Sequence, residues 1–202
     1  ESFLSARRMM YWQVYLHKTA VSAEAMLMQI MDRATSLMKK DSLLISTPSL
    51  ATFLRNNITA EDLLNTPKLL DLYAELDAHD IWGSIKFWKE SDDFVLRTLS
   101  NQLLRRELFR ITFANEKTGD LEISALLSKI RATYKLSEEE GQFFIKQGIV
   151  SNSAYLPTNQ FINILKKTGE ILDVAEASDL PNIKAMSKSV QKHFLCAPKS
   201  IF

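Results

Sequence analysis

Four side chains near the start of the chain have the types and spacing that suit the binding of a phosphorylated ligand. Arg7, Tyr11, Tyr15 and Lys18 are separated by four, four and three residues, so in a helix they lie on one face. A guanidinium can hold phosphate oxygens with two hydrogen bonds, and phenols can hydrogen-bond to or stack on the rest of a nucleotide. The alternative is a solvent-facing helix edge whose tyrosines lie against a neighbour and whose cations pair with acids.

The element that must position this column is the stretch from Phe3 to Lys39. It contains neither Gly nor Pro and holds six of the seven methionines. We expect one uninterrupted helix about 55 Å long, at a rise of about 1.5 Å per residue. Apolar residues fall on all its sides, which indicates burial on several sides. The methionines are interpreted as core filler or as a subunit interface, in preference to a cofactor site.

The next residues carry the signals of short helices. Thr47-Pro48 and Thr66-Pro67 each combine an N-cap with Pro at the first helical position, and residues 59–62 have the spacing of a capping box. Asp80 is expected to cap the helix that contains both Trp82 and Trp88, and residues 91–93 to open the following one. The first half of the chain is therefore predicted to be helical.

The pattern changes at Glu107. Residues 108–113 are rich in aromatic and β-branched types and predict a strand, residues 121–134 a helix, and residues 137–140 a capping box for a helix that Gly148 ends. Two strand-like runs, 161–167 and 170–177, are joined by Thr168-Gly169 as a hairpin. A polar helix from about Asn182 and an apolar tail at residues 194–196 complete the prediction.

The fold class expected is mainly α with a small C-terminal α+β part. It consists of a long N-terminal helix, a helical bundle and then an antiparallel sheet with a hairpin. The predicted division is a helical region over residues 1–106 and a small α+β domain over residues 107–202.

Composition limits the classes of function. A net charge of +1 and 46% hydrophobic residues are those of an ordinary soluble protein with a packed core, and argue against wrapping of nucleic acid or attraction to a membrane. The single cysteine, Cys196, excludes an intrachain disulfide and, with three scattered histidines, a Cys/His metal site. We expect a cytoplasmic protein. The chain does not begin with Met, and we interpret it as a piece of a longer protein.

Two other groups of residues have side chains of the types found in chemical sites. His79-Asp80 has the form of a metal-binding pair, but such a site also needs a separate His and a later Asp that converge on one ion. We interpret the pair as a helix cap preceded by a surface histidine. Arg105, Arg106 and Arg110 span a helix-to-strand junction and are interpreted as solvated surface, because they are not expected to face one way. No glycine-rich phosphate loop and no nucleophile with a nearby base are found.

The chain resembles HD-domain phosphohydrolases of the deoxynucleotide triphosphohydrolase type. Residues 7–18 resemble the long helix that follows their metal centre, residues 77–85 are similar to the next helical segment of bacterial members, and residues 105–109 match a helix-to-strand junction. The resemblance covers the whole chain and is most specific in the first forty residues. It implies the C-terminal part of an enzyme about twice as long, acting on (deoxy)nucleoside triphosphates.

The same resemblance implies a role for the polar column. Arg7 stands where the family places an arginine on the substrate phosphates. Tyr11 occupies a nearby position that is histidine in the mammalian enzyme, and Tyr15 matches a tyrosine that packs against the deoxyribose and helps to exclude a 2′-hydroxyl. Leu16 departs from the family, because it replaces a glutamine that touches the sugar or base.

His17 and Lys18 match a pair that, in regulated members, helps to bind an activating nucleotide between subunits. The reaction implied is attack on a phosphoester by a water that a divalent metal activates, with the metal ligands outside these residues. His79-Asp80 is then a coincidence. The chain itself is expected to hold no metal and no catalytic residue, and to be inactive alone.

Two alternatives use the same residues. The first is a non-catalytic helical dimerisation or interaction module, in which the Met-rich face from Val21 to Met38 forms a seam; both functions are compatible with one oligomeric enzyme. The second is nucleic-acid binding through the cations, which the near-zero net charge disfavours. The partners expected are a nucleotide and a second copy of the chain, through the long helix, with no membrane. The cations of the nucleic-acid alternative are Arg7, Arg8, Lys18 and Arg105.

Overall fold

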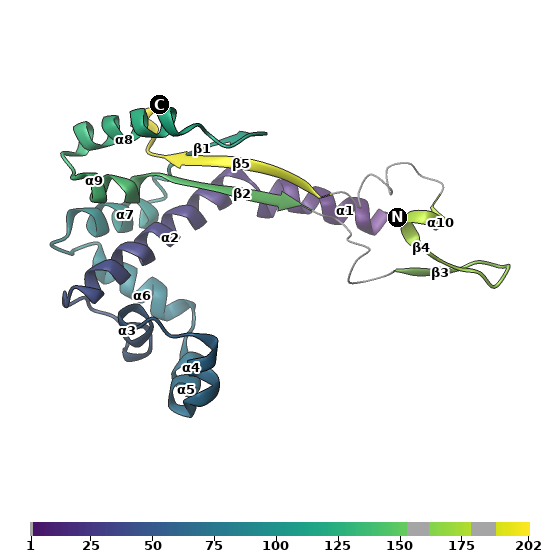
Figure 1. The fold of residues 1–202 in the computed structure, drawn as a ribbon, viewed down its shortest axis with the longest axis horizontal. Coiled ribbons are helices and arrows are strands. Elements are labelled where there is room, and N and C mark those ends of the chain that lie inside the picture. Colours follow the sequence, from purple (N-terminus) through teal and green to yellow (C-terminus); the bar gives the residue numbers. More distant parts are fainter. Residues whose placement is uncertain (1, 153–161, 179–188) are drawn as a thin grey trace.

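The fold is mainly helical with a small antiparallel sheet, as predicted. The computed structural model describes residues 2–152, 162–178 and 189–202. Figure 1 shows the three-stranded sheet lying between the second helix and the eighth, with the third to sixth helices on the other side of the second and the first helix extending to one end of the molecule. No helix among these residues is long and apolar enough to cross a membrane.

The helices and strands follow one another in this order: α1 (Ser2–Met10), a π-helical turn η1 (Tyr11–Tyr15), α2 (Lys18–Lys39), α3 (Pro48–Arg55), α4 (Ala60–Asn65), α5 (Pro67–Glu75), α6 (Ala78–Trp88), α7 (Phe94–Leu104), β1 (Arg110–Ala114), α8 (Asp120–Tyr134), α9 (Glu138–Gly141), a 3₁₀ turn η2 (Gln142–Phe144), β2 (Lys146–Asn152), β3 (Asn163–Leu165), β4 (Ile171–Asp173), α10 (Val174–Ala177), β5 (Val190–Ala197) and a 3₁₀ turn η3 (Lys199–Ile201).

The long N-terminal helix that the sequence predicts is interrupted. The amide of Leu16 donates to the Tyr11 carbonyl at 2.7 Å, a bond that skips one residue more than in an α-helix. His17 then has extended backbone angles, φ −65° and ψ 140°, and is the N-cap of α2. The prediction of one uninterrupted helix was therefore wrong. No local signal in the sequence marks this break, because it contains neither Gly nor Pro.

The capping signals are mostly confirmed. The Thr47 hydroxyl accepts from the Leu50 amide at 3.4 Å, and reciprocal capping boxes open α4 and α9. The prediction for α6 was wrong by one turn. Asp77 is the N-cap and Asp80 is the reciprocal partner, which accepts from the Asp77 amide at 2.8 Å. Both carboxylates fit the spacing of a box, so the pattern alone did not decide which one opens the helix.

The three-stranded sheet has the order β1-β5-β2, with both pairs antiparallel. Residues 194–196, predicted as an apolar tail, belong to its central strand. Gly148, predicted to end a helix, lies in β2 opposite Phe194. A Cβ at this glycine would lie 2.5 Å from a ring carbon of Phe194, so the bare backbone makes room for the ring. The polar helix expected from Asn182 falls mainly outside the described residues.

A second, two-stranded sheet contains the predicted hairpin. Leu165 lies opposite Ile171, and the turn places Gly169 at a φ of 83°, a conformation that glycine adopts without strain. The strands are shorter than predicted: residues 174–177 form α10 instead of continuing β4, and Phe161 lies outside the described residues.

One buried cluster joins the helices to the sheet. It contains Met26 and Ile30 of α2 together with Leu99, Phe144 and Leu195, so its members come from both of the ranges predicted as domains. The Ser22 hydroxyl of α2 also donates to the Phe109 carbonyl at 2.8 Å. The division at residue 106 stays a prediction.

A partly buried ion pair ties α2 to the start of α7. The Arg33 guanidinium donates two hydrogen bonds to the Asp93 carboxylate, at 3.1 and 2.6 Å. Asp93 also accepts from the Leu96 amide at 2.8 Å as the N-cap of α7. Burial opposes the ionisation of Asp93, but the hydrogen bonds from Arg33 and Leu96 outweigh it and hold the pKa of this carboxyl below its usual value.

Candidate functional site

Three members of the predicted polar column lie together. The Arg7 guanidinium carbon is 5.7 Å from the centre of the Tyr11 ring, within the range of a cation–π contact. The rings of Tyr11 and Tyr15 are 5.0 Å apart between centroids and tilted by 51°. Arg7 is exposed and 54% of Tyr15 is accessible. Arg7 and Tyr15 are therefore open to a ligand along one side of α1 and η1, and the half-buried Tyr11 lies between them.

Lys18, the fourth member, lies beyond the break in the helix. A π-turn and one extended residue stand between Tyr15 and the start of α2, so the 3.6-residue repeat does not continue across them. The structure brings Arg7, Tyr11 and Tyr15 together and directs Lys18 to a different pocket. His17, between the two groups, accepts at Nδ1 from the Thr19 amide at 3.2 Å.

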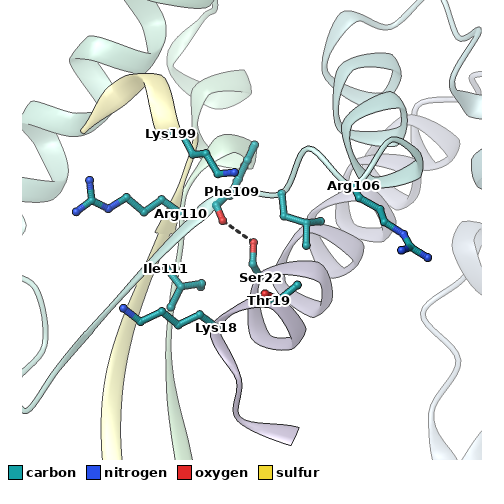
Figure 2. Close-up of a pocket in the computed structure, with 9 residues that line it drawn as sticks. Lys18, Thr19, Ser22, Arg106, Phe109, Arg110, Ile111 and Lys199 are labelled. Atoms are coloured by element: carbon teal, nitrogen blue, oxygen red, sulfur yellow. Dashed lines mark hydrogen bonds between the residues drawn. The ribbon is translucent and has the colours of Figure 1, made fainter. Parts of the chain in front are cut away.

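The pocket that Lys18 lines is strongly basic. It has a volume of about 590 Å³ and no acidic side chain in its wall. Figure 2 shows Lys18 and Arg110 on one side of the hydrogen bond between Ser22 and Phe109, and Arg106 on the other. No ion pair involves any of these cations in the part of the chain that the structure describes. Four cations line this basic pocket: Lys18, Arg106, Arg110 and Lys199.

The backbone at Arg106 is unusual. Its φ of 60° lies in the left-handed region, which costs a residue with a Cβ about 1–2 kcal/mol. The amides of Arg106 and Glu107 donate to the carbonyls of Leu103 and Gln102, the pattern of a Schellman motif, where glycine is usual. An arginine thus holds a position that glycine would occupy with less strain. Such strain is found at functional sites.

His17 borders a second pocket of about 600 Å³, beside the basic one. Its wall is more apolar and includes Val14 and Trp82. The two pockets share Thr19, Arg106 and Leu108, so they form adjoining hollows around the start of α2. The arrangement offers cations for phosphate in one hollow and an apolar surface with an indole in the next.

The sequence predicts that Arg105, Arg106 and Arg110 are solvated surface, and all three are exposed. Arg106 and Arg110 also line the basic pocket, whereas Arg105 does not. Lys199, which follows the last strand, carried no signal, since only the fold brings it near Lys18.

The C-terminal sheet holds the N-terminal helix in place. The side-chain amide of Asn152, in β2, donates to the Arg8 carbonyl at 3.3 Å, and Asn152 is only 1% exposed. From β5, the Lys192 ammonium lies 5.2 Å from the centre of the Trp12 ring. These contacts hold α1 and η1, which carry Arg7 and Tyr11, against residues more than a hundred positions away in the chain.

His79-Asp80 has the local role that the sequence interpretation gave it, except that Asp77 is the cap. The His79 side chain is 95% exposed and its Nδ1 lies 3.1 Å from the Asp77 carboxylate. The hydrogen bonds with His79 lower the pKa of Asp77. Among the residues the structure describes, no three His, Cys, Asp or Glu side chains are placed to share a metal ion.

Cys196 does not have the environment of a nucleophile. It is buried next to the Ser22 hydroxyl, and burial raises the pKa of its thiol to about 11. Since the thiolate is the reactive form, this cysteine is inert near neutral pH.

Comparison with known proteins shows that the fold of this chain is shared with a solved phosphohydrolase. No protein-family model matches. The fold is shared with a phosphohydrolase from Bacteroides thetaiotaomicron, with a TM-score of 0.88 and 38% identity over 98% of this chain and 48% of that one. The chain is also 24% identical to the uncharacterized protein YwfO of Bacillus subtilis, over 100% of this chain and 45% of that protein. It therefore spans about half the length of the proteins it matches, one of which is a phosphohydrolase.

Proposed function

We propose that the chain is part of a metal-dependent HD-type phosphohydrolase that acts on (deoxy)nucleoside triphosphates. The observation that carries this proposal is the cluster of exposed Arg7, half-buried Tyr11 and exposed Tyr15 on α1 and η1, in a chain whose fold matches half of a phosphohydrolase. The cluster is the wall that holds the phosphates and sugar of the substrate. A cytoplasmic location belongs to the same proposal, since the single cysteine is a buried free thiol.

Each residue of the wall has a task that its chemistry suits. Arg7 binds phosphate oxygens and stabilises the charge that develops on them. Tyr11 keeps the guanidinium oriented through the cation–π contact and offers a hydroxyl to the phosphates. Tyr15 packs its ring on the deoxyribose, where a 2′-hydroxyl would clash. The π-turn that carries both tyrosines is a feature often found at functional sites.

The divalent metal belongs to another part of the enzyme in this proposal. The residues that the structure describes form no cluster of three metal-ligating side chains, so they do not fit a metal centre by themselves. We expect the 202-residue chain alone to show no nucleotide hydrolysis with Mg²⁺, Mn²⁺ or Co²⁺. Turnover under these conditions would contradict the division of labour proposed.

The test of the wall is Arg7→Ala in the full-length protein. Loss of a charged group that contacts the reacting phosphate lowers kcat about 100-fold or more, and Arg7→Lys recovers only part of it because an ammonium cannot form the two-pronged contact. Arg55→Ala, an exposed arginine on α3, is the matched control. If Arg7→Ala hydrolyses nucleoside triphosphates as the parent does, the wall is assigned wrongly.

We further propose that His17 and Lys18 contribute to a site for an activating nucleotide. The support is the basic pocket, in which Lys18 joins three arginine and lysine side chains without an acid, and the apolar hollow next to it that His17 and Trp82 line. The cations suit a triphosphate and the hollow suits a base. This site is separate from the wall, since the break in the helix lies between them.

The isolated chain suffices to test this second site. We expect a nucleoside triphosphate to change the fluorescence of Trp82 and to bind more weakly as salt is added, because charges dominate the contact. Lys18→Ala weakens this binding. Arg105→Ala, which removes a neighbouring cation outside the basic pocket, leaves it unchanged. Equal affinity in all three proteins would refute the assignment.

The alternative function is a helical interaction module that uses the Met-rich face from Val21 to Met38. Burial of part of this face inside the chain gives this alternative less support than the wall has. Of the residues between Val21 and Met38, Val21, Met26 and Met38 are buried inside the chain itself, and Met28 is 48% exposed. Assembly through the long helix stays a prediction. Intact hydrolysis by Arg7→Ala together with a change in assembly would favour this alternative.

A further inference from the structure

The outward side of α1 is apolar except for one arginine. Phe3 is 69% exposed, Met9 59% and Met10 43%, and Arg7 is exposed among them. Phe3, Arg7 and Met10 are separated by four and three residues, the spacing of one face of a helix. A helix at a protein surface normally turns its polar residues outward. We call these four residues the Phe3 face, after the most exposed apolar member.

The opposite side of α1 is the one that packs within this chain. Leu4 is buried, and the Arg8 carbonyl accepts the hydrogen bond from the side chain of Asn152. Figure 1 shows α1 extending from the start of α2 toward one end of the molecule. Large apolar side chains grouped on the outer face of such a helix mark a surface that another element covers.

The charge around the Phe3 face has a single sign. Residues 2–23 contain Arg7, Arg8 and Lys18 but no aspartate or glutamate. Arg7 forms no ion pair in the part of the chain that the structure describes. A guanidinium that is covered by another element needs a partner of opposite charge. The element that covers this face should therefore combine apolar side chains with negative charge.

The half of the longer protein that this chain does not span meets this requirement. The chain covers 48% of the phosphohydrolase whose fold it shares, and in the proposed function the other half supplies the divalent metal. Such metals are held by carboxylates, which are negatively charged. A metal and a guanidinium that hold oxygens of the same triphosphate lie within a few ångströms of each other. The metal-bearing half therefore has to approach the side of α1 that carries Arg7.

Two other occupants fit the Phe3 face less well. A second copy that used the same face would set the arginines of the two copies against each other, and like charges repel. An anionic membrane suits a helix face with cations and apolar side chains, but the net charge of +1 gives the chain little attraction to such a surface.

We propose that the metal-bearing half of the longer protein packs on the Phe3 face. The active site then lies in the interface between the two halves, with Arg7 reaching the phosphates from this side. Phe3, Met9 and Met10 form an apolar surround that excludes water, which strengthens the contact between the guanidinium and the phosphate. The identity of this half rests on the proposed function, but the packing is tested without measuring hydrolysis.

The first test is the oxidation of methionines in the full-length protein by dilute hydrogen peroxide, followed by mass spectrometry. We expect Met9 and Met10 to oxidise at least about tenfold more slowly in the folded protein than after unfolding in guanidinium chloride, because peroxide does not reach covered thioethers. Met28, which is 48% exposed on α2, shows how much partial exposure alone slows the reaction. Equal slowing of all three methionines would overturn the proposal.

The second test identifies what covers the Phe3 face. Benzoylphenylalanine replaces Phe3 in the full-length protein, and illumination joins it to whatever lies against it. We expect a cross-link within one polypeptide, to a residue outside these 202. A cross-link between two copies, to another of the 202 residues or to lipid from added anionic vesicles would overturn the proposal. An equal yield from the same probe in place of Leu64, which is 84% exposed on α4, would also overturn it.

The outcomes separate this inference from the proposed function. If the expected cross-link forms and the full-length protein hydrolyses no nucleoside triphosphate, the packing stands and the proposed function is wrong. If the protein hydrolyses nucleoside triphosphates but Phe3 gives no cross-link to the other half, the function stands and the packing is wrong.

Discussion

Replacing Arg106 by glycine should stabilise the protein while it weakens anion binding. Arg106 has a φ of 60° at the C-terminal end of α7, a conformation that costs a residue with a Cβ about 1–2 kcal/mol. Glycine removes that cost but loses about 0.4–1 kcal/mol more backbone entropy on folding. The central values of the two terms leave a net gain of about 0.8 kcal/mol, or about 2–3 °C in Tm for a chain of this size.

The same substitution takes one of the four cations out of the basic pocket. A hydrogen bond to a charged group contributes about 1.5–3 kcal/mol. We therefore expect the affinity for a nucleoside triphosphate to fall by about tenfold or more. Thermal unfolding and calorimetric titration of the isolated chain measure the two effects separately. Arg106→Ala keeps the backbone strain, and it should reproduce the loss of binding without the gain in stability.

Lys135 provides the control for the backbone effect. It has a φ of 56° at the end of α8 and lines neither hollow beside α2. Lys135→Gly should raise Tm by a similar amount and leave binding unchanged. If Lys135→Gly stabilises the chain and Arg106→Gly does not, strain at Arg106 is offset by contacts of its side chain. If Arg106→Gly binds the triphosphate as the parent does, Arg106 is no part of the site.

Other predictions concern the framework around the site. Asp93→Ser keeps an oxygen to cap α7 but removes the ion pair with Arg33, so the free energy of unfolding in urea should fall by about 2 kcal/mol. Asp93→Ala also removes the cap and should lower the free energy of unfolding by about 1 kcal/mol more. The pKa of Asp93 is lower in the folded state, so its contribution is complete above about pH 4 and is lost as the pH falls. The Asp93→Ser variant should lose less stability on acidification than the parent; an equal loss would contradict this origin. Gly148→Ala should cost about 1–3 kcal/mol because the new methyl group meets Phe194, and Phe194→Leu in the same chain should recover part of that loss.

Much of the fold followed from local signals in the sequence. Thr47-Pro48, Thr59 and Ser137 were recognised as helix starts, because a capping side chain and its amide lie within three residues of each other. The hairpin turn at Gly169 was recognised for a similar reason. The error at Asp80 shows the limit of such signals, since two carboxylates three residues apart satisfied the same pattern.

The candidate site was predicted only in part. Arg7, Tyr11 and Tyr15 lie together because their spacing acts within one helical segment. The grouping of Arg106, Arg110 and Lys199 with Lys18 depends on contacts between segments remote in the chain, for which spacing carries no information. The three aromatic and basic residues of the wall were thus accessible to sequence reasoning, and the basic pocket was not.

The sequence by itself determined most of the helical segments and where most of them begin, because propensity and capping act within a few residues. The tertiary structure decided where the long helix breaks and where the sheet forms. The break at His17 separates the wall from the basic pocket without Gly or Pro. The central strand β5 pairs with strands that begin at residues 110 and 146, and such pairings depend on surfaces that only the folded chain brings together.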